Sequence, residues 1–186
     1  MNEHKRKFLR DQSMINSITG AFQHAGIYIS GLPESDPNKK RVRDTLKEQI
    51  VKLAKSYQNT VTDSDHCSNI EQLANFISSE FHGKGVLRND RFRIGISQKA
   101  LNLYLKYLWC LDEIPTPPHC PIDRIIIQKL GIPQQQQSQY DWTKLDCIQK
   151  YKYLISRCRE NLEALSIAEW ELQVWGFSQS TNSSLV

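Results

Sequence analysis

Apolar residues recur at intervals of three and four along most of this chain, the spacing that places them on one face of an α-helix. Alternating apolar and polar runs, which are typical of strands, are scarce. The pattern therefore predicts an all-α fold, a compact multi-helix domain. The expected helices lie within residues 14–29 and over residues 37–57, 68–81, 97–111, 121–130, 142–164 and 166–175.

Short signals mark where several of these helices begin and end. Asp36 followed by Pro37 is a helix start, because aspartate accepts hydrogen bonds from free amides and proline fits the first turn. The glycines of His82-Gly83-Lys84-Gly85 can adopt the left-handed backbone that closes a helix. The domain organisation that follows is a flexible polar lead-in over residues 1–12, a single helical domain over 13–177 and a disordered tail over 178–186.

The segment Ser97–Leu111 is apolar nearly all round rather than along one stripe. A helix of this kind is covered by other elements on every side. We therefore expect it to be central and buried. Trp109 within this segment, together with Trp170 and Trp175 near the end of the chain, is interpreted as a core residue rather than a base-stacking group.

Composition narrows the class of protein only a little. The chain of 186 residues has a net charge of +4, which permits nucleic-acid binding without requiring it. It contains no apolar run of the roughly 18–20 residues that a membrane span needs, and its first ten residues are too polar for a secretory signal. The prediction is an intracellular, cytoplasmic protein without membrane association. Its five cysteines lack the spacing of a metal site and are expected to be reduced thiols, with no metal or cofactor.

The stretch with the clearest chemical signal precedes the apolar helix. A glycine before a helix leaves backbone amides pointing outward at the positive end of the helix dipole, where a phosphate can bind. Basic residues just upstream add non-specific attraction to a polyanion. The expected phosphate-binding turn consists of Gly95, Ile96, Ser97 and Gln98. The upstream basic residues are Lys84, Arg88, Arg91 and Arg93.

The string Gly95-Ile96-Ser97-Gln98-Lys99-Ala100 resembles the hairpin of the helix-hairpin-helix DNA glycosylases, the endonuclease-III-like and 8-oxoguanine-glycosylase-like superfamily. Their pattern is a glycine, an apolar residue, a second glycine, any residue and a lysine that opens a helix; Ser97 stands here in place of the second glycine. In that family an aspartate follows at the start of the next helix, which Asp123 matches. The resemblance covers about residues 95–131, a fifth of the chain.

The resemblance implies a helix-hairpin-helix element and a DNA glycosylase with lyase activity. A glycosylase flips its target base out of the duplex into a pocket. Lys99 would be the nucleophile that forms a Schiff base with the sugar, and Asp123 would stabilise the positive transition state. Asn102 and Lys106 share one helix face with Lys99 and would line the pocket. The cysteines that ligate the cluster of endonuclease-III-like members are absent, so no iron–sulfur cluster is expected.

Two alternatives remain open at this point. The first is a non-catalytic DNA-binding module that keeps the hairpin but has no base pocket. The second is a helical protein-interaction domain in which the resemblance is accidental. Each site residue also has a structural interpretation: Lys99 as a solvated lysine near a helix start, Asp123 as a carboxylate favoured at a helix N-terminus, and the arginines as part of a solvated loop.

Overall fold

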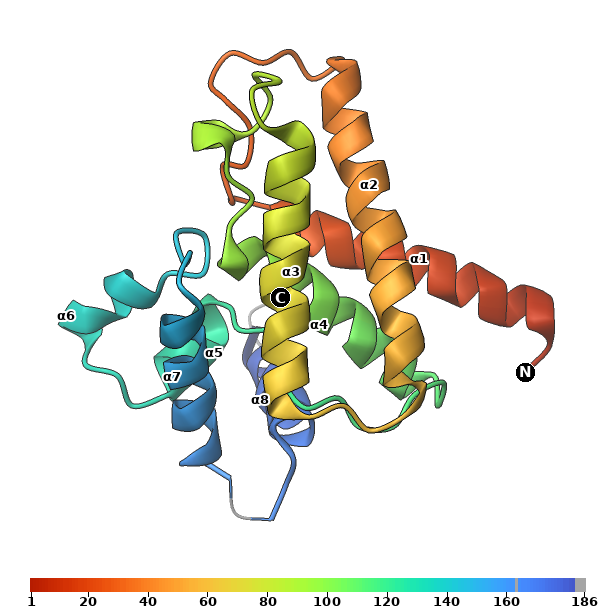
Figure 1. Cartoon of the computed structure of the whole chain (residues 1–186). Helices are drawn as coiled ribbons and strands as arrows, with labels where there is room; N and C mark the ends of the chain where they lie inside the picture. The colour runs from red at the N-terminus through yellow and green to blue at the C-terminus, as the bar shows by residue number, and fades with distance from the viewer. Residues whose placement is uncertain (163, 183–186) are drawn as a thin grey trace.

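Helix α4 (Ile94–Cys110) runs through the centre of the molecule, as its all-round apolar sequence predicts. It packs against α1, α3, α2 and α7 (Figure 1). Most of its side chains are buried, including Ile96, Leu101 and Leu105, which are fully covered. Because each neighbouring helix buries its apolar stripe against α4, this helix organises the core.

The computed structural model describes residues 1–162 and 164–182, and within these residues the fold is all-helical. Within the described residues, extended backbone pairs at one isolated antiparallel bridge, between Tyr28 and Leu87. None of the described helices combines the length and the apolar character needed to cross a lipid bilayer. Besides α4, the α-helices are α1 (Glu3–Phe22), α2 (Pro37–Ala54), α3 (Asp63–Phe81), α5 (Arg124–Lys129), α6 (Gln134–Gln137), α7 (Ile148–Arg159) and α8 (Ile167–Asn182). Three short 3₁₀ turns, η1 (Lys55–Gln58), η2 (Arg88–Asp90) and η3 (Ser138–Tyr140), complete the regular structure.

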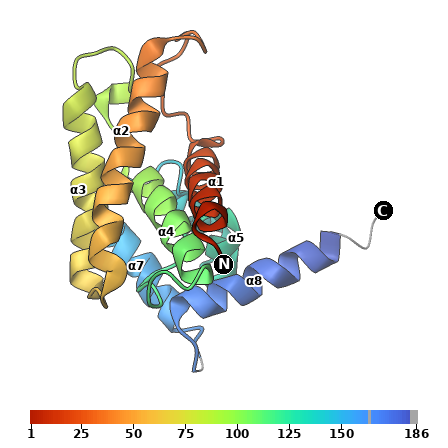
Figure 2. The ribbon, with the colours of Figure 1, turned by 90° about the vertical axis from the view of Figure 1, so that its right-hand side faces the viewer.

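Helices α2 and α3 lie side by side and form one layer, with α1 and α4 behind them (Figures 1 and 2). The start signal at Asp36 is confirmed, because its side chain accepts a hydrogen bond from the amide of Asn38. Helix α3 ends at Phe81, and Gly83 then takes the expected left-handed backbone with φ of +67°. These local signals set the length of both helices.

The first helix begins much earlier than its apolar pattern predicts. Residues 3–12, expected as a flexible lead-in, belong to α1. Asn2 caps this helix by accepting from the amide of Lys5, and an ion pair between Lys7 and Asp11 supports its first turns. Arg10 reaches Glu113, which ties the polar turns to the rest of the molecule. Polar contacts rather than apolar burial therefore extend the helix toward the N-terminus.

The C-terminal helices also differ from the expected bounds. Helix α7 starts at Ile148 rather than near Trp142, because residues 141–146 are not helical and cross the start of α4 instead. Helix α8 continues to Asn182, so residues 178–182 of the expected disordered tail are helical, and residues 183–186 lie outside the described residues.

A hydrogen-bonded polar cluster lies within the core where α3, α4 and α7 meet. The hydroxyl of Tyr57 lies 2.6 Å from Nδ1 of His66, and the hydroxyl of Tyr151 lies 2.9 Å from Nδ1 of His119. The two imidazole rings are perpendicular with centroids 4.6 Å apart. Burial lowers the pKa of His66 to about 3 and also lowers the pKa of His119. Both histidines are therefore neutral at neutral pH.

We predict that acid weakens the fold well above the pH at which carboxylates titrate. Below pH 6.5 the unfolded chain protonates His66, whose pKa in the folded chain is about 3, so the free energy of unfolding falls as the pH drops; His119, whose pKa is also lowered, acts in the same direction. Each histidine contributes up to about 1.4 kcal/mol per pH unit. Urea unfolding between pH 6.5 and 4.5 measures this slope. His82→Gln, at an exposed histidine, should leave it unchanged, and a flat profile would contradict the prediction.

Candidate functional site

The first amides of α4 are already bonded within the protein. The amide of Gly95 donates to the carbonyl of Leu145 at 2.8 Å, and those of Ile96 and Ser97 both donate to the carbonyl of Arg93 at 3.1 Å. Gly95, Ile96, Ser97 and Gln98 are all buried. The expectation that this turn is exposed to a phosphate is therefore wrong.

A carboxylate of the chain itself occupies the place expected for the phosphate. Oδ1 of Asp146 accepts a hydrogen bond from the amide of Ile94 at 3.1 Å. Both carboxylate oxygens of Asp146 also accept from the guanidinium of Arg91, at distances of 2.8 to 3.1 Å. A helix N-terminus with an arginine beside it does attract an anion, as the sequence suggested. Here the anion is the side chain of Asp146, a residue of the same chain.

Gly95 is required for close packing rather than for a hairpin. Helix α4 begins at Ile94, so Gly95 lies inside its first turn, and residues 82–93 separate it from α3. A Cβ atom on Gly95 would lie 1.9 Å from the carbonyl oxygen of Trp142. The 141–146 segment can cross the start of α4 at this distance only because the side chain is absent.

Two polar side chains of α4 fix the segment that leads to α5. Gln98 donates to the carbonyl of Ile122 at 2.7 Å and accepts from its amide at 3.0 Å. Asn102 donates to the carbonyl of Cys120 at 2.9 Å and to the hydroxyl of Tyr151 at 3.1 Å. Because Asn102 is fully buried in these contacts, it is not a pocket residue as expected.

The other predicted basic residues are largely engaged inside the protein. Lys106 forms an ion pair of 3.0 Å with Glu171 and does not line the cleft with Lys99. Lys84 pairs with Glu80, and Arg93 donates to the backbone carbonyls of Ala25 and Gly26. The contacts of Arg91 and Arg93 correct the expectation that these two arginines hold phosphates, whereas Lys84 remains exposed to solvent.

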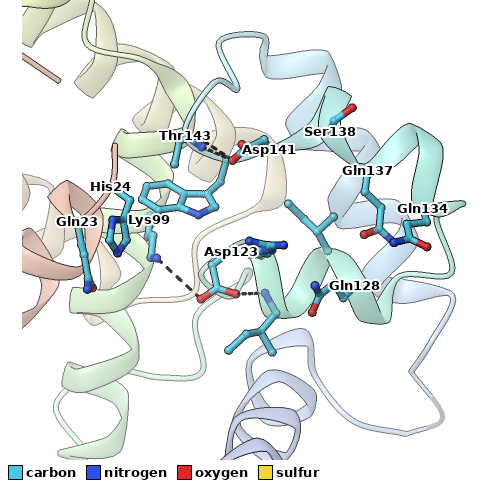
Figure 3. A pocket seen from close by; sticks show the side chains of 14 residues that line it. Gln23, His24, Lys99, Asp123, Gln128, Gln134, Gln137, Ser138, Asp141 and Thr143 are labelled. Atoms are coloured by element: carbon cyan, nitrogen blue, oxygen red, sulfur yellow. Dashed lines mark hydrogen bonds and ion pairs between the residues drawn. The ribbon is translucent and has the colours of Figure 1, made fainter. Parts of the chain in front are cut away.

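Lys99 and Asp123, in contrast, line one cleft of about 760 Å³ (Figure 3). Nζ of Lys99 lies 3.9 Å from Oδ2 of Asp123. It also lies 4.0 Å from the centre of the Trp142 ring, within range of a cation–π contact. The cleft is bounded by the end of α1, by α4, α5 and α6, and by residues 138–143. Its lining residues include Gln23, His24, Arg124, Gln128, Gln134 and Gln137.

The amine of Lys99 is less stable as a cation than an ordinary lysine. Its side chain is 13% exposed, and burial lowers its pKa, while the nearby carboxylate of Asp123 offsets part of this effect. A lower pKa increases the fraction of neutral amine, the form that acts as a nucleophile. The arrangement therefore suits covalent chemistry at Nζ.

Asp123 also has a structural role. Its side chain caps α5 by accepting hydrogen bonds from the amides of Ile125 and Ile126, at 2.9 and 3.2 Å through Oδ1. The other carboxylate oxygen faces Lys99. The capping interpretation and the site interpretation of Asp123 are thus compatible.

Sequence reasoning missed Trp142 and His24 as cleft residues. Trp142 fits the apolar spacing of the following helix, and this spacing concealed its position opposite Lys99. His24 follows the end of α1 in a left-handed conformation with φ of 59°, and the sequence carries no signal for its place in the cleft. Among the described residues, no group of three or more His, Cys, Asp or Glu side chains has the arrangement of a metal site.

No protein-family model, curated protein or solved structure matches the chain. The resemblance to the glycosylases therefore depends on residues 95–131 alone.

We predict that Gly95→Ala lowers the free energy of unfolding by about 3 kcal/mol, because the new methyl group overlaps the backbone at Trp142. Gly176→Ala is the matched control: it also lies within a helix, and no described atom lies within 4 Å of its Cβ position. That change should be neutral or should stabilise by about 0.5–1 kcal/mol. Urea unfolding measures both variants, and equal stabilities would contradict the close approach.

Proposed function

We propose that the cleft is the active site of a DNA glycosylase with lyase activity, in which Lys99 is the nucleophile. The observation that carries the proposal is the buried amine of Lys99, with its lowered pKa, 3.9 Å from the carboxylate of Asp123 in an open cleft. Glycosylases of this kind need a neutral amine and an anion in reach of the same sugar carbon.

The chemistry assigned to the two residues is a displacement at C1′ of a deoxynucleotide. A bond forms between Nζ of Lys99 and C1′ as the bond from C1′ to the base breaks, and the base leaves with the bonding pair and takes up a proton. Asp123 stabilises the positive charge that develops on the sugar. Opening of the sugar ring then gives an imine between Lys99 and C1′.

The lining of the cleft suits a flat, polar ring. Trp142 places an aromatic ring in the wall of the cleft beside Lys99, and amide side chains such as Gln128 and Gln134 can both donate and accept hydrogen bonds. Bases that are read outside the duplex are recognised by stacking and by hydrogen bonds to their edges. A volume of about 760 Å³ lies within the usual range for small-molecule pockets.

Phosphate contacts in this proposal come from the rim of the cleft rather than from the amides of α4. Arg124 lines the cleft and is exposed. Arg88 is exposed and lies beside Gly26, two residues after the cleft residue His24. Both guanidinium groups can bind phosphate oxygens in a bidentate manner.

A second candidate is a DNA-binding protein without catalysis. The capping role of Asp123 favours it, because this carboxylate would be retained for α5 even without a reaction. Such a protein would need a phosphate-binding surface other than residues 95–98, whose amides are engaged inside the fold.

We predict that borohydride traps the protein covalently on a DNA duplex that contains an abasic site. Duplexes carrying uracil or 8-oxoguanine test base removal in the same assay. Lys99→Gln should abolish the adduct, whereas Lys144→Gln, at an exposed lysine close to the cleft, should trap like the native protein. Trapping should rise with pH and level off below the pH typical of a free lysine, because the neutral amine reacts.

Denaturing gel electrophoresis measures the adduct. Absence of an adduct with the native protein on all three duplexes would overturn the catalytic proposal. An equal yield with Lys99→Gln would assign the reaction to another amine and overturn the role of Lys99.

A further inference from the structure

Positive charge is concentrated in the first third of the chain. Residues 1–55 contain 11 of the 24 lysines and arginines but only 6 of the 20 aspartates and glutamates. This part therefore carries a charge of +5, while residues 56–186 carry −1. The modest net charge of the whole protein conceals this asymmetry.

Helix α2 presents most of this charge to solvent. Its buried stripe, which includes Val42, Leu46 and Ile50, faces the core. Exposed cations follow one another along the opposite side over about 22 Å, at 1.5 Å per residue. We refer to this side as the basic face, which consists of Lys40, Arg41, Lys47 and Lys52 of α2 and Lys55, the first residue of η1.

The acidic residues on the same helix neutralise only part of the basic face. Asp44 forms an ion pair of 2.5 Å with Lys40, and Glu48 lies on the exposed side as well. Lys39 is different from the others, because it is buried and paired with Glu34. A hollow of about 530 Å³ lies against the second half of the face, and its lining combines three lysines with two carboxylates and a valine: Lys47, Lys52, Lys55, Asp44, Glu48 and Val51.

We propose that the basic face docks on the phosphate backbone of double-stranded DNA. A straight row of exposed cations complements a duplex, which carries one negative charge per about 1.7 Å of its axis. A membrane-binding helix would instead carry large apolar side chains beside its cations. Among the described residues of α2, Val51 is the one large hydrophobic side chain that is exposed.

The basic face is separate from the Lys99 cleft, to which α2 contributes none of the described lining residues. Binding through this face therefore does not depend on the proposed reaction. It supplies the phosphate contacts that the start of α4 cannot make. These contacts hold the protein on DNA without reading its sequence.

The experiment is fluorescence anisotropy of a dye-labelled 20-base-pair duplex of mixed sequence, titrated with the full chain at 50 and 200 mM salt. The test variant combines Lys47→Gln, Lys52→Gln and Lys55→Gln, which preserves helix propensity. The matched control combines Lys84→Gln, Lys150→Gln and Lys152→Gln, which removes the same charge from exposed positions that line neither the basic face nor the Lys99 cleft.

The native protein should bind the duplex at 50 mM salt. The test variant should bind at least tenfold more weakly, and its salt dependence of log K should be shallower by about 2 to 3. The control should change affinity less than threefold. The duplex carries neither an abasic site nor a damaged base, so a failure of the borohydride assay leaves this result unaffected.

Three outcomes would overturn the basic face as a DNA-docking surface. The first is the absence of native binding at 50 mM salt, and the second is an equal loss of affinity in the test and control variants. The third is tighter binding to vesicles of 30% phosphatidylserine in phosphatidylcholine than to the duplex, which would assign the face to a membrane instead.

Discussion

The contact between the carboxylate of Asp146 and the start of α4 determines much of the rest of the structure. It satisfies the amide of Ile94 and the guanidinium of Arg91 together, at the positive end of the central helix. The neighbouring carbonyl of Leu145 bonds to the amide of Gly95, so the whole 141–146 segment lies across the first turn. Trp142 is held opposite Lys99 as a result, and the cleft acquires its aromatic wall.

The cleft combines groups that stabilise the fold with groups suited to chemistry. Asp123 caps α5 with one oxygen and faces Lys99 with the other. Burial makes the Lys99 cation less favourable and increases the fraction of neutral amine, while Asp123 opposes part of this effect. The same burial that destabilises the charged form makes this lysine a candidate nucleophile, because a fully solvated amine remains protonated at neutral pH.

Periodicity and capping residues were sufficient to predict the fold class and the central position of α4. They failed where polar contacts decide the path of the chain. Residues 3–12 have too few apolar positions to indicate a helix, which the Asn2 cap and ion pairs support instead. Trp142 and Leu145 have helical spacing, yet their segment is not helical and packs across the first turn of α4. The sequence indicated an anion near Gly95 and Arg91. It did not indicate that this anion is Asp146, which lies 52 residues after Ile94 and is marked by no local pattern. The pairing of Lys99 with Asp123 came from the family resemblance, and His24 was not foreseen at all.

The absence of a side chain at Gly95 has a consequence for the cleft itself. The carbonyl oxygen of Trp142 lies where a Cβ atom would be, and the 141–146 segment covers the amides of Ile94 and Gly95. A larger residue at this position would push that segment, and Trp142 with it, away from the start of α4. The shape of the cleft is thus conditional on a single absent methyl group.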